Sequence, residues 1–189
     1  MIFSFLRDNA RWVAGGFLLT FFSSFGQTYF ISLSAGEIRA EYGLSHGGFG
    51  TLYMLATLAS AATLPQIGKI VDRISVASTV LLAAPVLAIA CLLMAWSTSL
   101  VLLVLSVYLL RLFGQGMFTH IAMTAMGRWF AAQRGRAISL TAIGVNFGEA
   151  LFPISFVGVA ALVGWRGSWL VAAGVLLLIA LPAIYSLLK

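Results

Sequence analysis

Long apolar stretches follow one another along the whole chain, with short polar breaks between them. A helix that crosses a bilayer needs about 20 apolar residues, and hydropathy predicts six such helices. Their ranges are 12–34, 48–67, 76–96, 100–124, 137–162 and 168–188. No segment alternates with period two, as the strands of a membrane barrel would. The pattern therefore predicts an all-α membrane protein with six transmembrane helices.

The composition supports a protein that lies mostly within the bilayer. Of the 189 residues, 61% are hydrophobic and 8% are charged, whereas soluble domains carry about 25% charged residues. The single cysteine, Cys91, excludes an intrachain disulfide and a cysteine-based metal cluster. The two histidines, His46 and His120, have no spacing typical of metal ligands. We therefore expect no cofactor and no metal.

The distribution of basic residues predicts the orientation. Eight of them fall on one side of the predicted membrane: Arg7, Arg11, Lys69, Arg73, Arg128, Arg134, Arg136 and Lys189. Only Arg39 and Arg166 fall in breaks on the other side. Because cytoplasmic loops are enriched in Lys and Arg, we expect a multi-pass protein of the cell (inner) membrane with both termini in the cytoplasm. The eight residues belong to separate loops and form no continuous face, so no nucleic-acid partner is expected.

A short motif occurs twice in the chain. Phe25-Gly26-Gln27 lies in the first predicted helix and Phe113-Gly114-Gln115 in the fourth, at an offset of 88 residues. The same offset carries Pro65 onto Pro153. We interpret the chain as two three-helix units, the second entering the membrane from the opposite side. Such 3+3 inverted repeats are typical of secondary transporters.

Two ionisable residues lie near the predicted centre of the bilayer, Arg111 and Glu149. Each costs about 2.5–3.5 kcal/mol on insertion scales. One interpretation is a structural ion pair, and the other is a solute or proton site. A carboxylate in a partly dry site can exchange protons near neutral pH, so Glu149 is the candidate proton-coupling residue.

Polar side chains form a stripe on the fourth predicted helix. Tyr108, Arg111, Gln115 and Thr119 are spaced by three or four residues and should share one face. Gln27 belongs to a similar stripe on the first helix. Amide groups in hydrocarbon need hydrogen-bond partners, which favours an aqueous cavity between the two helices. We predict Arg111, Gln115, Gln27 and Tyr108 as solute-binding residues, although hydroxyl side chains also serve simple helix packing.

Small residues on the fifth predicted helix indicate close packing. Gly144 and Gly148 form a small-xxx-small pattern, and Pro153 can bend the helix beyond them.

Three segments resemble sequences of the major facilitator superfamily (MFS). The loop Gly68 to Arg73, GKIVDR, resembles the superfamily's loop signature, with a glycine, an aspartate four residues later and then a basic residue. Arg111 with Gly114-Gln115-Gly116 resembles its arginine-containing motif in helix 4, with a spacing one residue longer. The loop Arg128 to Ala137 is also similar to many members. The resemblance extends over essentially the whole chain.

The sequence also departs from the superfamily pattern. Ser75 occupies the position of a frequent second glycine, and Val76 and Ala77 occupy positions of basic residues. Glu149 follows Gly148 where drug antiporters tend to have proline, so antiport is not carried over from the resemblance.

The resemblance implies a fold in which helices 1 and 4 line a central cavity, helices 2 and 5 flank it, and helices 3 and 6 face lipid. It also implies that Gly68, Asp72 and Arg73 govern conformational gating; the alternative is that Asp72 caps the next helix or fixes its own loop. Members have twelve or more spans in two halves. We therefore expect residues 1–189 to be the N-terminal six-helix half, whose partner is a second half. The alternative is a natural half-size protein that dimerises.

The function predicted from these features is secondary active transport of a small solute, an organic anion or a drug-like compound, by alternating access. Coupling to protons or exchange, as a symporter or antiporter, is expected. The partners are then the solute, the lipid bilayer and the second half. The alternative is a membrane-embedded enzyme or a non-transporting sensor on the same fold. We expect no enzyme and no catalytic residue, because no pair of aspartates lies within the predicted spans and the histidines lie near opposite ends.

Overall fold

The described chain is almost entirely helical. A computed structural model describes residues 2–189, and within this range there is no strand. The prediction of an all-α fold is confirmed. The helices in chain order are α1 (Ile2–Phe22), η1 (Ser23–Gly26), α2 (Thr28–Ser32), α3 (Ala35–Tyr42), α4 (His46–Ile67), η2 (Gly68–Asp72), α5 (Val76–Trp96), α6 (Leu100–Leu109), η3 (Leu110–Phe118), α7 (Thr119–Trp129), η4 (Ala131–Gln133), α8 (Arg134–Val175), η5 (Leu176–Ala180) and α9 (Leu181–Leu188).

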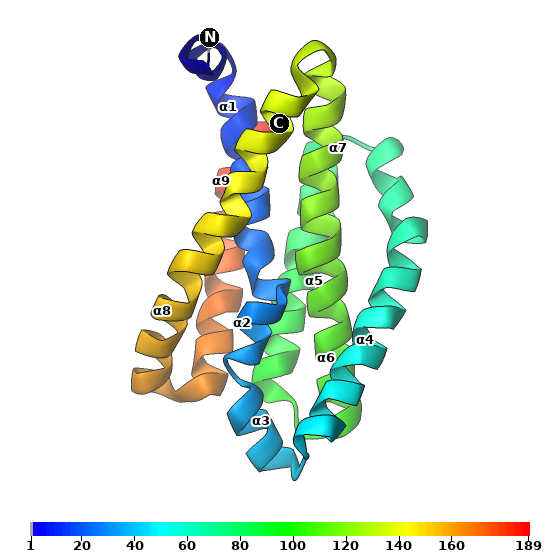
Figure 1. The fold of residues 1–189 in the computed structure, drawn as a ribbon, viewed down its shortest axis with the longest axis vertical. Helices are drawn as coiled ribbons and strands as arrows, with labels where there is room; N and C mark the ends of the chain where they lie inside the picture. The colour runs from blue at the N-terminus through cyan, green and yellow to red at the C-terminus, as the bar shows by residue number, and fades with distance from the viewer. Residues whose placement is uncertain (1) are drawn as a thin grey trace.

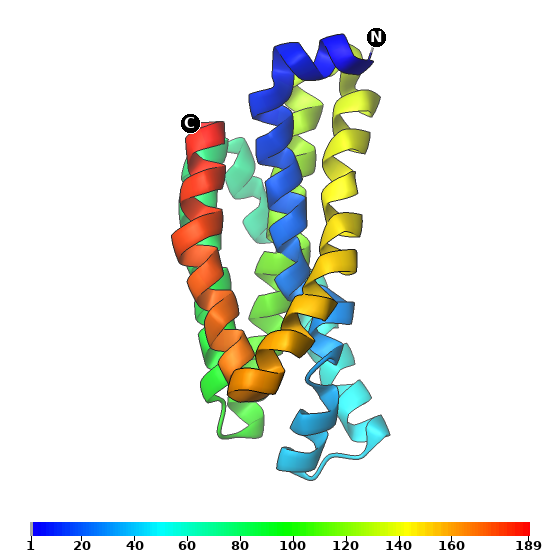
Figure 2. The same ribbon diagram turned by 90° about the vertical axis from the view of Figure 1, so that its left-hand side faces the viewer.

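The helices form an elongated antiparallel bundle (Figure 1). Both termini lie at the same end, which we call the terminal end, and the opposite end carries α3. In the view of Figure 2, the chain descends along α8, reverses at the opposite end and returns through α9. The reversal is at Gly164, whose φ of 73° and ψ of 170° interrupt the helix. A side chain would disfavour this positive φ, so glycine permits the turn.

Four helical stretches are long and apolar enough to cross a membrane. They are His46–Asp72, Val76–Trp96, Leu100–Trp129 and Ala131–Leu188. The last has 58 residues and contains the reversal at Gly164, which falls between two of the predicted helices. The first helix begins at Ile2 rather than at residue 12 and is interrupted at Gln27, which is extended at φ −79° and ψ 153°. Six spans and their 3+3 repeat therefore stay a prediction.

Glycines set the contact between α1 and α8. A β-carbon on Gly144 would lie 2.2 Å from Thr20 Oγ1, and one on Gly148 would lie 1.9 Å from Ser24 Oγ. The close approach lets the Thr20 hydroxyl donate a hydrogen bond to the Thr141 carbonyl at 2.5 Å. The predicted packing role of Gly144 and Gly148 is confirmed.

The outer faces of α5 and of the η5–α9 stretch are apolar and exposed. On α5, Leu82 is 53% exposed, and on η5, Leu178 is 79% exposed. The inner face of α5 is instead fully buried, with Leu87 and Met94 at 0%. Each helix thus presents a single apolar face outward, where lipid would contact it, and α5 supplies much of the buried core with its other face.

Candidate functional site

The two copies of the repeated motif meet in the middle of the bundle. A β-carbon on Gly26 would lie 2.0 Å from the Leu110 carbonyl oxygen and 2.6 Å from Gly114 Cα. A β-carbon on Gly114 would lie 2.5 Å from Gly26 Cα. The end of η1 and the π-helix η3 therefore touch backbone to backbone, which only glycine allows. This contact brings the Gly26 carbonyl to the side chain of Arg111.

Arg111 is buried against three different segments. It is 8% exposed, and its Nη1 donates hydrogen bonds to the Gly26 carbonyl at 3.1 Å and to Thr28 Oγ1 at 3.2 Å. Its guanidinium carbon lies 5.5 Å from the centre of the Tyr53 ring, within the range of a cation–π interaction. The Tyr53 hydroxyl donates to Thr28 Oγ1 at 2.9 Å, so η1, α2 and α4 all position the guanidinium.

No carboxylate among the described residues lies within ion-pair distance of Arg111. Glu149 is exposed on α8, one residue after Gly148, which packs on α1. The hypothesis of an Arg111–Glu149 ion pair is therefore not supported by the geometry. Similar depth in the membrane does not bring two side chains together when their helices pack on different neighbours.

A pocket of about 450 Å³ opens beside Arg111. It is lined by Thr57, Ser60, Ala61, Leu64, Arg111, Leu112, Gln115, Gly116, Thr119, His120 and Met123. These residues come from α4, η3 and α7. The lining combines apolar side chains with a few polar groups, as is typical of small-molecule sites.

Three polar atoms of this lining are buried without a hydrogen-bond partner among the described residues: Arg111 Nε, Thr57 Oγ1 and Thr119 Oγ1. Buried polar groups in proteins are nearly always hydrogen-bonded. All three residues line this one pocket, and the three atoms themselves have almost no accessible surface. This is the strongest structural signal for a binding site in the described chain.

The structure gathers only some of the predicted solute-binding residues at this pocket. Gln115 and Arg111 line it. Gln27 does not; it stands at the break before α2, and its Nε2 donates to Ser23 Oγ at 3.4 Å. The Tyr108 hydroxyl donates to Thr63 Oγ1 at 3.0 Å, and its ring lines a separate apolar groove between α4 and α6.

The position of Tyr108 has a physical reason. It precedes η3, a π-helix of nine residues from Leu110 to Phe118. In a π-helix the hydrogen bonds run from i to i+5, so side chains rotate by a smaller angle per residue than the α-helical spacing assumes. A stripe drawn with α-helical spacing therefore does not follow one face across Leu110.

Thr28, Tyr53 and Thr57 were missed by the sequence analysis. Thr28 directly follows the first copy of the repeated motif, and Tyr53 and Thr57 are four residues apart on α4. That spacing places the two on one helix face. It is the signal that could have identified α4 as a contributor to the site.

The loop Gly68 to Arg73 is fixed to α7 at the terminal end. His120 Nε2 lies 3.2 Å from the Gly68 carbonyl oxygen, and Asp72 forms an ion pair with Arg128. The Arg128 Nη1 also donates to the Val71 carbonyl at 2.9 Å. Asp72 is not the cap of α5.

Ser75 provides that cap, because its side chain accepts a hydrogen bond from the Ser78 backbone N–H at 3.0 Å. Arg73 is exposed, and the structure describes no ion pair for it. The loop is thus held through Asp72 and leaves Arg73 facing outward.

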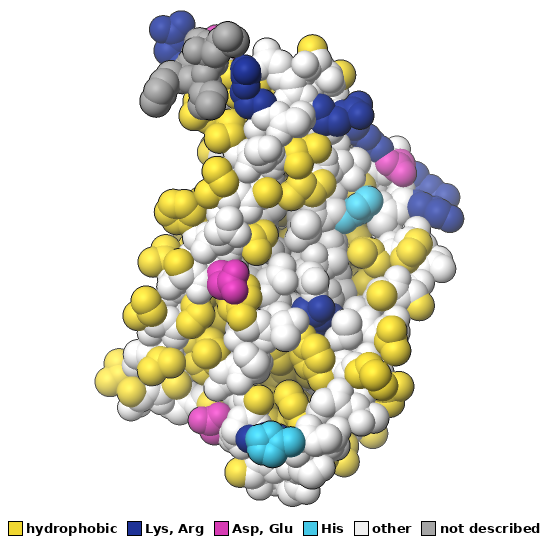
Figure 3. Space-filling model, in the orientation of Figure 1, with side chains coloured by type: hydrophobic (Ala, Val, Ile, Leu, Met, Phe, Trp, Pro, Cys, Tyr) yellow, Lys and Arg dark blue, Asp and Glu magenta, His cyan; other side chains and the backbone are white. Residues whose placement is uncertain are grey.

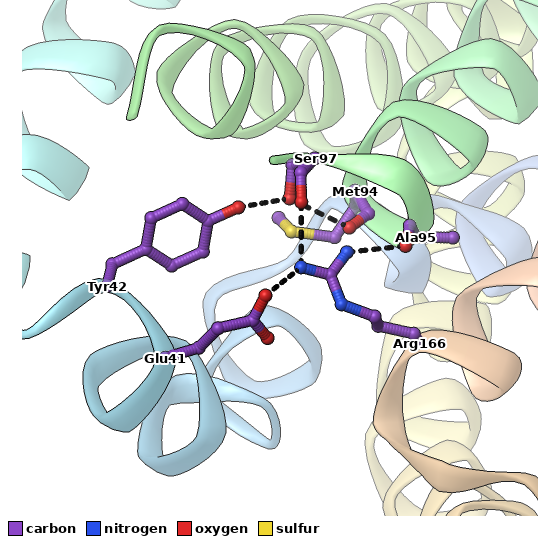
Figure 4. A network of polar contacts seen from close by, with 6 residues as sticks. All are labelled: Glu41, Tyr42, Met94, Ala95, Ser97 and Arg166. Carbon is purple, nitrogen blue, oxygen red and sulfur yellow. Dashed lines mark hydrogen bonds and ion pairs between the residues drawn. The ribbon is translucent and has the colours of Figure 1, made fainter. Parts of the chain in front are cut away.

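A second polar network closes the opposite end (Figure 4). Arg166 donates to the carbonyl oxygens of Ala95 at 2.6 Å and Ser97 at 2.7 Å, and it forms an ion pair with Glu41. The Tyr42 hydroxyl donates to Ser97 Oγ at 2.8 Å. One arginine thus joins α3, the end of α5 and the reversal after Gly164.

On the face shown in Figure 3, charged side chains are sparse over the middle, and basic ones gather at the terminal end. Within residues 2–189 there is no group of three His, Cys, Asp or Glu side chains that could hold a metal. An apolar helical bundle with a pocket at a buried arginine is consistent with a membrane protein that has a small-molecule site.

Comparison with known proteins identifies the family. The family model described as Major Facilitator Superfamily matches residues 16–189, and the chain belongs to this family. Its members are membrane transporters of small solutes, so the protein is a multi-pass membrane transporter, and membership favours transport over the enzyme considered from the sequence. No curated protein and no solved structure matches the chain.

Proposed function

We propose that the protein is a secondary active transporter that moves a small organic anion by alternating access, with the pocket beside Arg111 as its solute site. The observation that carries this proposal is the guanidinium of Arg111, which lines the pocket, has no acidic partner among the described residues and has a buried Nε without a hydrogen-bond partner.

The charge of Arg111 favours an anionic solute. A cation within the membrane is costly unless other groups compensate it. The Gly26 carbonyl and the Tyr53 ring compensate it in part, and a bound carboxylate would complete the compensation. Guanidinium groups bind carboxylates through charge-assisted hydrogen bonds.

The other pocket residues suit the remainder of such a solute. The hydroxyls of Thr57 and Thr119 and the amide of Gln115 offer further donors, while Leu64 and Met123 offer apolar contacts. Gln27 and Tyr108 act in this proposal by holding the helix break and the α4–α6 contact, from which they position the site.

Proton coupling is assigned to Glu149. It is the only carboxylate in the part of α8 between Arg134 and Gly164, and it follows directly on the packed Gly148. Its side chain is exposed on α8. This role supports symport or antiport with protons.

The proposed architecture is six spans in a 3+3 inverted repeat, paired with a second six-helix half. The backbone contact between Gly26 and Gly114, which the 88-residue offset relates, supports the repeat. The pocket is bounded by α4, η3 and α7, which leaves its remaining side for the second half. The gathering of basic residues at the terminal end supports cytoplasmic termini in the cell membrane.

Gating is assigned to the loop that carries Gly68, Asp72 and Arg73. Its ion pair from Asp72 to Arg128 fixes the loop to α7, and α7 also contributes Thr119 and His120 to the pocket. Movement of the loop is therefore coupled to the shape of the solute site.

Ligand-induced thermal stabilisation of the purified protein in detergent tests the solute class. A ligand that binds the folded state raises the melting temperature. We expect stabilisation by members of a panel of small carboxylates, and not by amines or neutral compounds of matched size. Arg111→Gln should abolish it, whereas Arg7→Gln, at a side chain that is 84% exposed, should not. Stabilisation by amines alone, or an unchanged response in Arg111→Gln, would overturn the proposal.

A further inference from the structure

A second cavity of about 450 Å³ lies near the terminal end, between η2 with the last turn of α4, α5 and η3. We call it the η2–α5 groove. The residues that matter here are Lys69, Arg73, Leu82, Val86, Phe113 and Met117. It is separate from the solute pocket, because none of these six side chains lines that pocket.

The groove has a basic end. Lys69 and Arg73 are both exposed, and the described ion pairs involve neither of them. The nearest acidic residue in sequence, Asp72, is already paired with Arg128. The two positive charges are therefore available to an anionic group that comes from outside the chain.

The rest of the groove is apolar and faces outward. Leu82 is 53% exposed on α5, and Val86 lies one helical turn further along the same helix. Phe113 and Met117 of η3 contribute the lining on the other helix. From Thr79 to Val86 the groove follows α5 for about 10 Å, at 1.5 Å per residue, which matches the first part of a lipid acyl chain.

We infer that the η2–α5 groove binds one anionic phospholipid, with its headgroup phosphate on Lys69 and Arg73 and an acyl chain along Leu82 and Val86. A basic pocket between membrane helices at the level of the headgroups is a recognised lipid-binding arrangement. The occupant follows from charge complementarity at one end and apolar lining at the other. A soluble phosphate would contact only the basic end and would leave the apolar lining unused.

Bound lipid would connect α4 to α5 across the loop Gly68 to Arg73. Lipid occupancy is therefore expected to restrict this loop, which Asp72 and Arg128 also hold. The inference depends on the membrane location of the chain and is independent of the identity of the solute.

Native mass spectrometry of the protein in detergent, titrated with phosphatidylglycerol, tests the inference. We expect one tightly retained phosphatidylglycerol and weaker retention of phosphatidylcholine of the same chain length. The double variant Lys69→Gln/Arg73→Gln should bind phosphatidylglycerol about thirtyfold more weakly. Glycerol 3-phosphate, which has the charged group without acyl chains, should not compete at equal concentration.

Matched variants keep the test specific. Arg134→Gln/Arg136→Gln removes two charges at the same end but outside the groove and should leave retention unchanged. Leu82→Trp should fill the groove and weaken binding, whereas Leu81→Trp, on the same helix outside the lining, should not. Lys69→Arg/Arg73→Lys keeps both charges and should retain the lipid. This variant gives a separate measurement if the double glutamine variant does not fold.

Three results would overturn the inference. Equal losses of phosphatidylglycerol retention in the two double glutamine variants would mean that the lipid is attracted generally to the basic end of the molecule. Effective competition by glycerol 3-phosphate would mean a site for free phosphate. Unchanged retention in Leu82→Trp would mean that no acyl chain lies in the groove.

Discussion

At the scale of single residues, Arg111 shows how a buried cation can be positioned before a ligand arrives. Its Nη1 is held by Gly26 and Thr28, and its plane lies near the Tyr53 ring. The Nε, by contrast, has no partner among the described residues. The guanidinium is thus divided between Nη1, which the protein holds, and Nε, which is buried without a partner in a residue that lines the pocket.

This division of the guanidinium predicts the effect of Arg111→Lys. Lysine keeps the charge but has a single ammonium group without the planar fork, so it cannot serve both the Gly26 carbonyl and the pocket. We expect anion binding, measured by thermal stabilisation, to weaken at least about tenfold, the equivalent of one lost charge-assisted hydrogen bond. The melting temperature without ligand should change little. Full binding in Arg111→Lys would show that charge alone recognises the solute.

At the scale of helices, the contact between η1 and η3 depends on the absence of side chains at Gly26 and Gly114. It joins the interrupted first helix to the π-helix that carries Arg111. Such an approach leaves no room to relax, because the atoms it brings together are backbone.

Gly26→Ala should therefore destabilise the bundle. The added carbon would lie 2.0 Å from the Leu110 carbonyl oxygen, and overpacking of this kind costs about 1–3 kcal/mol. Gly36→Ala is the control, because nothing lies within 4 Å of a β-carbon there. Unfolding in denaturant, followed by tryptophan fluorescence, gives the difference. Equal stability of the two variants would contradict the described contact.

The ion pair of Asp72 with Arg128 makes a separate prediction. Their side chains are 58% and 47% exposed, and exposed ion pairs contribute only about 0–1 kcal/mol to stability. Asp72→Asn should therefore lower the transport rate much more than the amount of folded protein, if the loop gates transport. Asp8→Asn, in the exposed pair with Arg7, provides the control. Proportional losses of protein and transport would assign Asp72 a purely structural role.

Much of the helical arrangement was predictable because each apolar stretch must satisfy its backbone within the bilayer. The polar break near Gly164 and the recurrence of Gly26 at Gly114 were visible in the sequence. The π-helix was not, since its hydrogen-bond pattern depends on the packing of η3 against η1. The partners of Arg111 were also unpredictable, because hydropathy gives the depth of a residue and leaves helix neighbours undetermined. Because the π-helix was not anticipated, Tyr108 was expected on the same face as Gln115.

At the scale of the whole molecule, the bundle is polarised between its two ends. The terminal end carries the basic loops, and the opposite end is closed by the Arg166 network (Figures 3 and 4). This polarity is the structural basis for the expected orientation.

Cysteine labelling tests that orientation. Glu37 and Ala132 are exposed at opposite ends, and Cys91 is fully buried. In a Cys91→Ala background, an impermeant thiol reagent added outside intact cells should label Glu37→Cys, while Ala132→Cys should react only after the membrane is opened. Labelling of both positions from outside would exclude cytoplasmic termini.

The backbone contact between Gly26 and Gly114 also has a mechanical consequence. The stretch Leu100–Trp129 has 30 residues and is about 45 Å long at 1.5 Å per residue, with Gly114 near its middle. A contact without side chains at that point allows the stretch to pivot about Gly114. A tilt of about 5° there displaces each end by about 2 Å, given arms of about 22 Å. The displacement is largest at the ends of the stretch. One of these ends is Trp129, whose ring centre lies 4.8 Å from that of Trp12 at the terminal end.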